Sequence, residues 1–213
     1  MKRYLTELIG TFFLVLTIGL ATLGNAQLAP IAIGSALMVM VYMGGHVSGA
    51  HYNPAVTLAV LVRGKIDATE VAPYWLSQIA GAVAAGAAVY AIVGETFAPA
   101  PAPEASALAV LLAETLVTFA LSLVVLNVAT SEKTKGNSYY GLAIGFTVLA
   151  GAIVAGPVSG GAFNPAVGIG PALVHALIGG GSLSHVWYYL VGPFAGAVAA
   201  AAVFRVQESA GKA

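Results

Sequence analysis

The chain has 213 residues, of which 59% are hydrophobic and only 8% are charged, and its formal net charge is zero. A soluble domain usually carries about 25% charged residues, so this composition excludes an ordinary soluble protein and indicates several membrane spans. The balanced charge gives no reason to expect nucleic acid as a partner. The chain has no cysteine, which excludes disulfides, thiolate nucleophiles and cysteine metal sites.

The predicted elements are long, unbroken apolar helices separated by short polar or Gly- and Pro-rich turns. Six of them are predicted to cross the membrane: residues 4–23, 30–43, 70–93, 105–129, 138–155 and 184–204. Two further apolar runs, 53–62 and 164–177, are short. At about 1.5 Å per residue the first of these reaches roughly 15 Å, half of a hydrocarbon core of about 30 Å. The predicted fold class is therefore an all-α membrane protein with six transmembrane helices and two re-entrant half-helices.

Both short runs begin with the same motif. Residues 48–56 read SGAHYNPAV and residues 159–167 read SGGAFNPAV, with six of the nine positions identical. In each copy the Asn side chain can cap the first free backbone N–H groups, and Pro fits the first helical position because it has no N–H to lose. The candidate functional residues of the two copies are Asn53, Pro54, Ala55, Asn164, Pro165 and Ala166.

The two halves of the chain resemble each other beyond this motif. ELIGTFF, which begins at Glu7, matches ETLVTFA, which begins at Glu114, and AGAVAA occurs at 80–85 and again, in the same order along the chain, at 195–200. We therefore expect a single transmembrane domain over residues 1–213 with repeats at approximately 4–93 and 105–205. Each half has an odd number of full spans, so the second half is predicted to be inverted. The working site is then expected at the midplane, where the broken helices meet.

The basic residues predict the orientation in the membrane. In the six-span arrangement all eight fall on one side: Lys2, Arg3, Arg63, Lys65, Lys133, Lys135, Arg205 and Lys212. By the positive-inside rule both termini are predicted to be cytoplasmic. The first half-helix then enters from the cytoplasm and the second from outside, so that their Asn-Pro ends meet.

Two helix N-termini that face each other concentrate positive potential, about half an elementary charge each, which repels a cation. The Asn NH₂ groups can donate hydrogen bonds to a passing water and so interrupt a proton wire. The backbone before each Asn, residues 44–52 and 156–163, is expected to be non-helical and to present carbonyl oxygens to the pore, which hydrocarbon allows only beside protein or a watery cavity.

These features together resemble the aquaporin, or major intrinsic protein, family over about residues 4–205. The resemblance is carried by HVSGAHYNPAV at 46–56, by the second Asn-Pro-Ala, by the Glu-x-x-x-Thr-Phe pattern in spans one and four, and by Gly170-Pro171. It implies a right-handed bundle that forms a homotetramer in a lipid bilayer, with one pore per subunit. It also implies passive passage of water or small neutral solutes. The sequence has no cysteine, no paired acids near a pocket, no metal triad and no phosphate-binding Gly loop that opens onto Lys, so we expect no cofactor, no metal and no enzymatic activity.

The chain departs from the family pattern at one informative position. Most members have Arg directly after the second Asn-Pro-Ala, whereas this chain has Val167. By the resemblance, the outer selectivity filter maps onto Ile33, Ala152, Gly161 and Val167, which would form a wide, apolar ring. Glycerol facilitators usually have Asp one position further on, where this chain has Gly168, which argues against a dedicated glycerol channel without excluding glycerol passage.

Four other polar residues are candidates for function. Glu7 and Glu114 are carboxylates inside spans and are either proton relays or, as the repeat favours, acceptors that hold the motif loops in place. His46 and His51 flank the first motif loop, where they form either a cytoplasmic pH gate or, as we favour, pore lining or loop bracing.

The preferred interpretation is a passive, cation-excluding channel for water and small neutral solutes. The first alternative is a facilitator mainly for glycerol, urea, ammonia or hydrogen peroxide. Others are a proton-coupled secondary transporter, which would need a charged site, and a non-conducting membrane protein. The composition favours a prokaryotic inner membrane.

Overall fold

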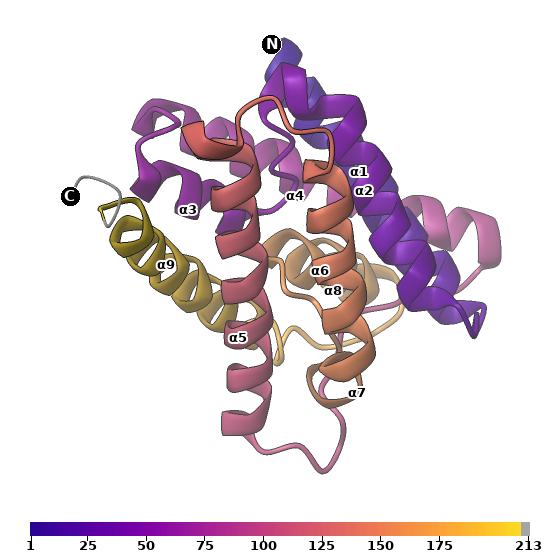
Figure 1. Cartoon of the computed structure of the whole chain (residues 1–213). Coiled ribbons are helices and arrows are strands. Elements are labelled where there is room, and N and C mark those ends of the chain that lie inside the picture. Colours follow the sequence, from indigo (N-terminus) through magenta and orange to yellow (C-terminus); the bar gives the residue numbers. More distant parts are fainter. Residues whose placement is uncertain (210–213) are drawn as a thin grey trace.

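The computed structural model describes residues 1–209, and within them every regular element is a helix (Figure 1). The long helices are α1 (Lys2–Leu23), α2 (Ala29–Ser48), α4 (Ala68–Val93), α5 (Ala107–Val125) and α9 (Tyr188–Ser209). The shorter elements are α3 (Pro54–Arg63), the π-helical turn η1 (Leu126–Thr130), the 3₁₀ turn η2 (Glu132–Thr134), α6 (Tyr140–Val154), α7 (Gly156–Ser159) and α8 (Pro165–Ile178). Five helices are long and apolar enough to cross a membrane: α1, α2, α4, α9 and α5 extended through η1.

The predicted fifth span, residues 138–155, corresponds to α6, and the short helix α7 continues it beyond the predicted end. α6 has only 15 residues, and the short helix α7 follows after Ala155. Pro157 explains the interruption, because it has no N–H to donate and its ring crowds the carbonyl group of Ile153. α6 and α7 together occupy residues 140–159, which are related by the motif offset to residues 29–48 of α2. The fold class predicted from the sequence is thus confirmed, with a kink in one span.

The predicted end of the second span at residue 43 is wrong, because α2 continues to Ser48. Gly44 and Gly45 suggested a break. Gly44 instead lies inside the helix, and the Tyr52 ring packs so closely on it that a Cβ atom would overlap the Tyr52 hydroxyl. The sequence does not reveal this close packing, and the low helix propensity of glycine does not end the helix here.

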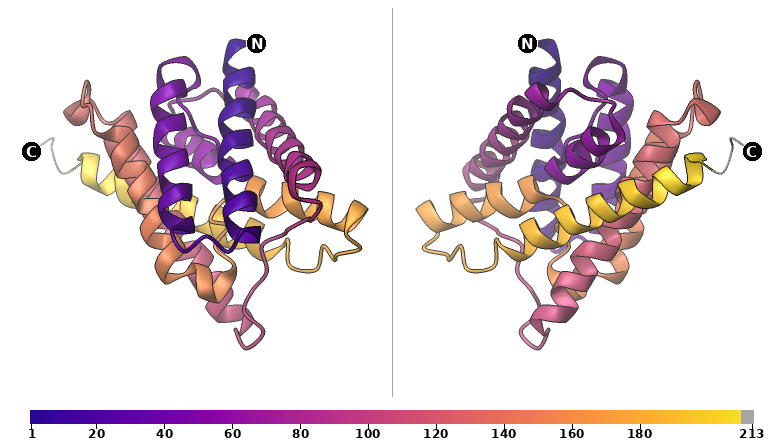
Figure 2. Two further views of the ribbon diagram at one scale, coloured as in Figure 1. Left: turned by 90° about the vertical axis from the view of Figure 1, so that its right-hand side faces the viewer. Right: turned by 90° about the vertical axis from the view of Figure 1, so that its left-hand side faces the viewer.

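The two halves of the molecule use the same helix pairs. α1 packs on α4 as α5 packs on α9, and α2 packs on α6 between the halves. Each half-helix lies against the last long helix of the other half, α3 on α9 and α8 on α4. α1 runs away from the N-terminal end of the molecule, whereas α5 runs toward it (Figures 1 and 2). The half-helices therefore join the two halves into one body.

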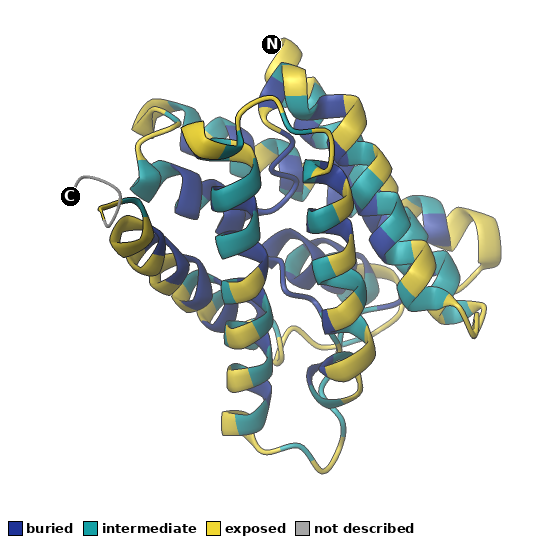
Figure 3. Ribbon diagram, in the orientation of Figure 1, coloured by how far each residue is buried: buried dark blue, intermediate teal, exposed yellow. Residues whose placement is uncertain are grey.

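Exposed positions lie along the outer faces of the helices (Figure 3), and many of them are large apolar residues, whereas several polar side chains are buried. Leu76 and Leu116 are 69% and 61% exposed, whereas Glu7 and Glu114 are fully buried. Apolar surface on this scale is unfavourable in water and is suited to lipid chains. The polar groups that face inward therefore belong to the interior of a membrane protein.

Glycines set the distance between the paired helices. A Cβ atom at Gly81 in α4 would overlap the backbone carbonyl of Leu8 in α1. At the corresponding place in the second half, a Cβ atom at Gly196 in α9 would overlap the carbonyl of Thr115 in α5. Such close backbone approach is typical of membrane helices, whose association depends on van der Waals packing.

We predict that Gly81→Ala and Gly196→Ala each lower the stability of the folded chain, by about 1–3 kcal/mol, because the helices must move apart. Thermal unfolding in detergent measures this effect. Gly156→Ala is the control, since a Cβ atom at this helical position meets nothing within 4 Å. Equal unfolding temperatures for all three variants would show that these two helix crossings tolerate a methyl group.

Candidate functional site

Two short loops in left-handed conformation lead into the half-helices. In the first, Gly49, Ala50 and Tyr52 have φ values of 86°, 51° and 49°. In the second, Gly160, Gly161 and Phe163 have φ values of 87°, 67° and 49°. The backbone reverses direction here, and glycine at the first position of each loop adopts this conformation without a steric cost.

The non-helical stretches are shorter than the sequence suggested. Residues 44–48 belong to α2 and residues 156–159 to α7, so their predicted non-helical conformation is wrong. Only residues 49–52 and 160–163 lie outside helices before each Asn. The carbonyl groups available to a pore are therefore limited to these two four-residue loops and the helix ends beside them.

The two Asn side chains connect the loops to each other. Oδ1 of Asn53 accepts a hydrogen bond from the Ala55 backbone N–H at 2.8 Å, and Oδ1 of Asn164 accepts one from Ala166 at 2.9 Å. The amide nitrogens bond across the molecule. Asn53 Nδ2 donates to the Phe163 carbonyl and Asn164 Nδ2 donates to the Tyr52 carbonyl, each at 2.9 Å.

This exchange fixes both amides and leaves each with one further donor. An Asn amide has two N–H groups, and the bond to the opposite loop uses one of them. Asn53 and Asn164 are 3% and 4% exposed, and both line the same cavity. The remaining N–H of each side chain is thus available to a molecule in that cavity.

Glu7 and Glu114 lie against the motif loops. Glu7 accepts hydrogen bonds from the Ser48 hydroxyl at 2.6 Å and from the backbone N–H groups of His51 and Tyr52 at 3.0 and 2.7 Å. It also accepts one from Gln78 Nε2 at 2.8 Å. A buried carboxylate with four donors is well compensated for its loss of solvation.

Glu114 has the matching role in the second half with one donor fewer. It accepts from the Ser159 hydroxyl at 2.7 Å and from the backbone N–H groups of Ala162 and Phe163 at 3.1 and 2.7 Å. No further donor to Glu114 occurs within the described residues. When AGAVAA at 80–85 is aligned with 195–200, Pro193 corresponds to Gln78. Proline has no side-chain donor, so Glu114 lacks the bond that Gln78 gives to Glu7.

Sequence reasoning missed the tyrosines that hold the loops from the other side. The Tyr74 hydroxyl donates to the Ser48 carbonyl at 2.7 Å, and the Tyr189 hydroxyl donates to the Ser159 carbonyl at 2.6 Å. Both tyrosines are almost completely buried. The alignment of 80–85 with 195–200 also pairs Tyr74 with Tyr189, and this signal in the sequence would have identified them.

The four residues mapped to the outer filter line one cavity together with both Asn side chains. This central cavity has a volume of about 180 Å³ and is lined by Ile33, Ala152, Gly161 and Val167 beside Asn53 and Asn164. Its walls are mainly apolar, and none of its lining residues is Asp, Glu, Lys or Arg. Two amides are therefore the main hydrogen-bond donors that side chains offer there.

A second cavity opens at the end of the molecule that holds the N-terminus. This vestibule has a volume of about 550 Å³, and charged residues such as Arg3, Lys65 and Glu70 line it. His46 lines only the vestibule and is exposed, whereas His51 is buried and lines both cavities. The structure thus separates the two histidines that flank the motif.

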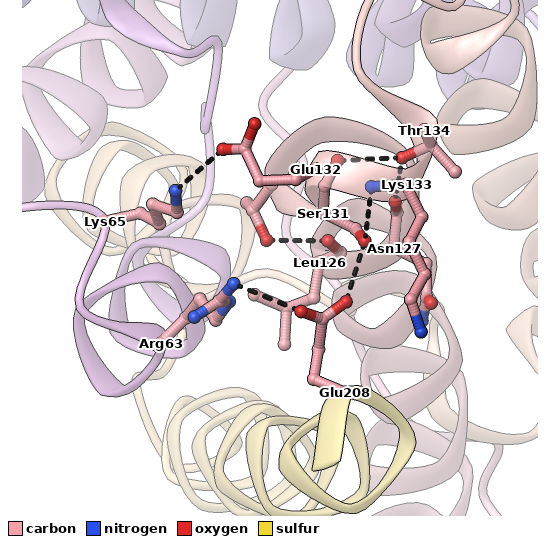
Figure 4. A network of polar contacts seen from close by, with 10 residues as sticks. Arg63, Lys65, Leu126, Asn127, Ser131, Glu132, Lys133, Thr134 and Glu208 are labelled. Carbon is pink, nitrogen blue, oxygen red and sulfur yellow. Dashed lines mark hydrogen bonds and ion pairs between the residues drawn. The ribbon is translucent and has the colours of Figure 1, made fainter. Parts of the chain in front are cut away.

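Charged and polar contacts join three segments beside the vestibule (Figure 4). Arg63 at the end of α3 lies 3.7 Å from Glu208 of α9, which also accepts a hydrogen bond from the Ser131 hydroxyl at 2.7 Å. Lys65 lies 3.4 Å from Glu132. Lys135 and, to a smaller extent, Lys65 hold the pKa of the exposed Glu132 carboxyl below its usual value. Lys212 lies outside the described residues.

Comparison with known proteins identifies the family. The family model described as "Major intrinsic protein" matches residues 1–204. The chain belongs to the major intrinsic protein family. It is a passive membrane channel, as members of this family are, and the family contains transport proteins rather than enzymes.

Individual relatives support the same assignment. The chain is 40% identical to "Aquaporin NIP1-1" of Zea mays, over 94% of this chain and 72% of that protein. It is also 40% identical to "Glycerol uptake facilitator protein-like 6" of Lactiplantibacillus plantarum, over 98% of this chain and 99% of that protein. The fold is that of the aquaglyceroporin from Plasmodium falciparum, with a TM-score of 0.84, 23% identity and coverage of 95% and 94% of the two chains.

We predict that Glu114→Gln loosens the second motif loop. An amide has one acceptor oxygen and places its NH₂ against N–H donors, so the loop loses charge-assisted bonds worth about 1–3 kcal/mol each. Hydrogen exchange of residues 160–163, followed by mass spectrometry, should become faster.

Glu95→Gln provides the matched control, because Glu95 is exposed in the loop after α4. It should leave exchange unchanged throughout the chain. Unaltered exchange of residues 160–163 in Glu114→Gln would mean that the carboxylate does not hold the loop.

Proposed function

We propose that the chain forms a cation-excluding pore for water and small neutral solutes, which passes through the central cavity. The observation that carries this proposal is the reciprocal pair of Asn amides. Each caps its half-helix, bonds to the opposite loop and keeps one N–H for the cavity. A water oxygen beside them can accept from both side chains, and its own hydrogens then point away along the pore.

Charge selectivity follows from the same place. The N-terminal ends of α3 and α8 lie at the two Asn residues, and each contributes about half a positive elementary charge. No carboxylate lines the central cavity to offset this potential. A cation would therefore lose hydration without gaining a compensating ligand, whereas a neutral molecule does not face this barrier.

The outer filter supports a broad range of neutral solutes rather than strict selection for water. We assign it to Ile33, Ala152, Gly161 and Val167, which share the wall of the central cavity. None of these side chains is aromatic or charged, so the ring can pass an apolar solute face that a polar ring would reject.

This apolar ring also favours the second candidate function, a facilitator for glycerol, urea, ammonia or hydrogen peroxide. The relative from Lactiplantibacillus plantarum, named as a glycerol uptake facilitator-like protein, supports the same candidate. A proton-coupled transporter is disfavoured because both buried carboxylates are occupied by loop donors. The two channel candidates differ only in which solute the pore carries best.

We assign the vestibule, and with it both termini, to the cytoplasmic side. Basic residues begin α1, end α3 and follow α5, and these segments lie at one end of the molecule (Figure 1). One relative at 40% identity is bacterial and another is from a plant, so the assignment to a prokaryotic inner membrane rests on the composition. The exposed apolar helix faces are suited to a homotetramer in the bilayer, as the family resemblance implies.

Proteoliposomes test the proposal directly. We expect stopped-flow shrinkage in hyperosmotic impermeant sugar to be faster than in empty vesicles, glycerol entry to be accelerated, and planar bilayers in potassium chloride to show no added current. Shrinkage equal to that of empty vesicles would disprove the channel. Solute flux that follows a proton gradient would favour the transporter instead.

We predict that Val167→Arg reduces glycerol and urea permeability about fivefold more than water permeability, because a long cation narrows the ring and holds water in place. Proteoliposome swelling and shrinkage rates measure both. Val167→Met is the control, since Met has similar reach without the charge. If neither variant alters solute entry, Val167 does not contribute to the filter.

A further inference from the structure

We propose that Val125 and His51 form a narrow neck on the vestibule side of the two Asn residues, and that Val125 sets the size of solute that passes. This inference rests on the proposed function, since it assigns the size-selecting step of the same pore. It moves that step away from the outer filter, to a residue of α5 that lies outside both motifs.

The first observation is the division of the pore into two cavities. The central cavity of about 180 Å³ and the vestibule of about 550 Å³ share only two lining residues, His51 and Val125. These side chains therefore stand where the cavities meet. Both side chains are buried in the protein.

The second observation is the course of α5 along the pore. Leu121 lines the central cavity, Val125 lines both cavities and Ala129 lines the vestibule, so residues four apart follow the pore wall. Val125 is the last residue of regular α-helix, and the π-helical turn η1 begins directly after it. Turns of this kind are frequent at functional sites. The wall thus changes from Val to the small side chain of Ala129 just beyond the neck.

The opposite wall is held rigidly. His51 Nδ1 lies 3.1 Å from the Thr57 hydroxyl, which donates to the Asn53 carbonyl at 3.1 Å and accepts from Gln78 at 3.0 Å. We assign the proton of that hydroxyl to the Asn53 carbonyl, so that Thr57 accepts from His51 and the ring proton is assigned to Nδ1. Nε2 then presents a lone pair on the side of Gly49, which lines the vestibule.

The second half of the chain shows what the pore is like without this neck. The motif offset pairs His51 with Ala162, and the Glu7–Glu114 offset pairs Val125 with Ile18. Ala162 and Ile18 both line the central cavity, which continues past them to Thr22 at the end of α1. With a methyl group in place of the imidazole, the outer half of the pore remains open. The pore is divided into two cavities only at the position of His51.

The neck combines one apolar wall with one fixed hydrogen-bond acceptor. A water or a hydroxyl group can donate to His51 Nε2 as it leaves the Asn N–H donors, so small unbranched neutral solutes keep a partner at each step. A wider or branched solute must instead displace Val125, which is packed in the core cluster with Leu121 and Ile144.

Substitutions of Val125 in opposite directions test the neck. In proteoliposomes, Val125→Ala should raise glycerol permeability about threefold or more while water permeability changes less, because width affects the larger solute first. Val125→Ile adds one methylene at the same place and should lower glycerol permeability by a similar factor. Val124→Ala on the same helix is the matched control, since Val124 lines neither cavity.

The outcomes separate this inference from the proposed function. If wild-type vesicles conduct and both Val125 variants keep the glycerol-to-water ratio of Val124→Ala, the neck is disproved while the channel stands. If wild-type vesicles do not conduct, the proposed function fails first. Size-exclusion chromatography of each variant in detergent, before it is reconstituted, establishes that it is folded. Should Val125→Ala not fold, the ratio measured for Val125→Ile decides alone, since a neck requires it to fall.

Discussion

The fold depends on satisfying the backbone of two non-helical loops inside an apolar bundle. Hydrocarbon offers no hydrogen-bond partners, so an open N–H or C=O group there costs several kcal/mol. Glu7 and Glu114 accept the backbone N–H groups near the end of each loop. Each Asn side chain bonds to one carbonyl group of the opposite loop, that of Phe163 or Tyr52. The two halves must therefore fold together, because neither can satisfy its own loop alone.

The pore chemistry is a consequence of this bonding. An Asn that caps its helix and reaches the opposite loop has only one N–H left, and its direction is fixed by the other bonds. Such preorganised donors require no rearrangement when a solute arrives. Because the carboxylates of Glu7 and Glu114 bond to the loops from behind, no charged side chain lines the central cavity. The support of the loops and the neutrality of the pore are thus two results of one arrangement.

Much of this arrangement can be predicted from the sequence, and the missing parts share a cause. The repeated motif predicts half-helices with Asn caps, and both caps are confirmed. Local sequence patterns did not predict features that depend on contacts between residues far apart in the chain. Tyr52 packs on Gly44 inside α2 and fills the space that a side chain would need, and Gln78 reaches Glu7 across 71 positions of sequence. Neither contact leaves a periodic pattern. The helix break at Pro157, by contrast, is a local effect that the proline itself predicts from the sequence.

An inverted repeat would produce a pore with two equivalent ends if its halves were identical. Both halves share the tyrosines that hold the loops, Tyr74 and Tyr189, whereas the cavity-lining residues His51 and Ala162 differ. His51 corresponds to Ala162 in the second half, so only the first motif carries an imidazole. The Gln78 amide, which bonds to the Thr57 hydroxyl beside His51, corresponds to Pro193, which has no side-chain donor. Passive flux has no preferred direction, so this asymmetry cannot make the channel pump. It can only move the narrowest point, and it moves that point toward the vestibule, where one α5 side chain then decides the width.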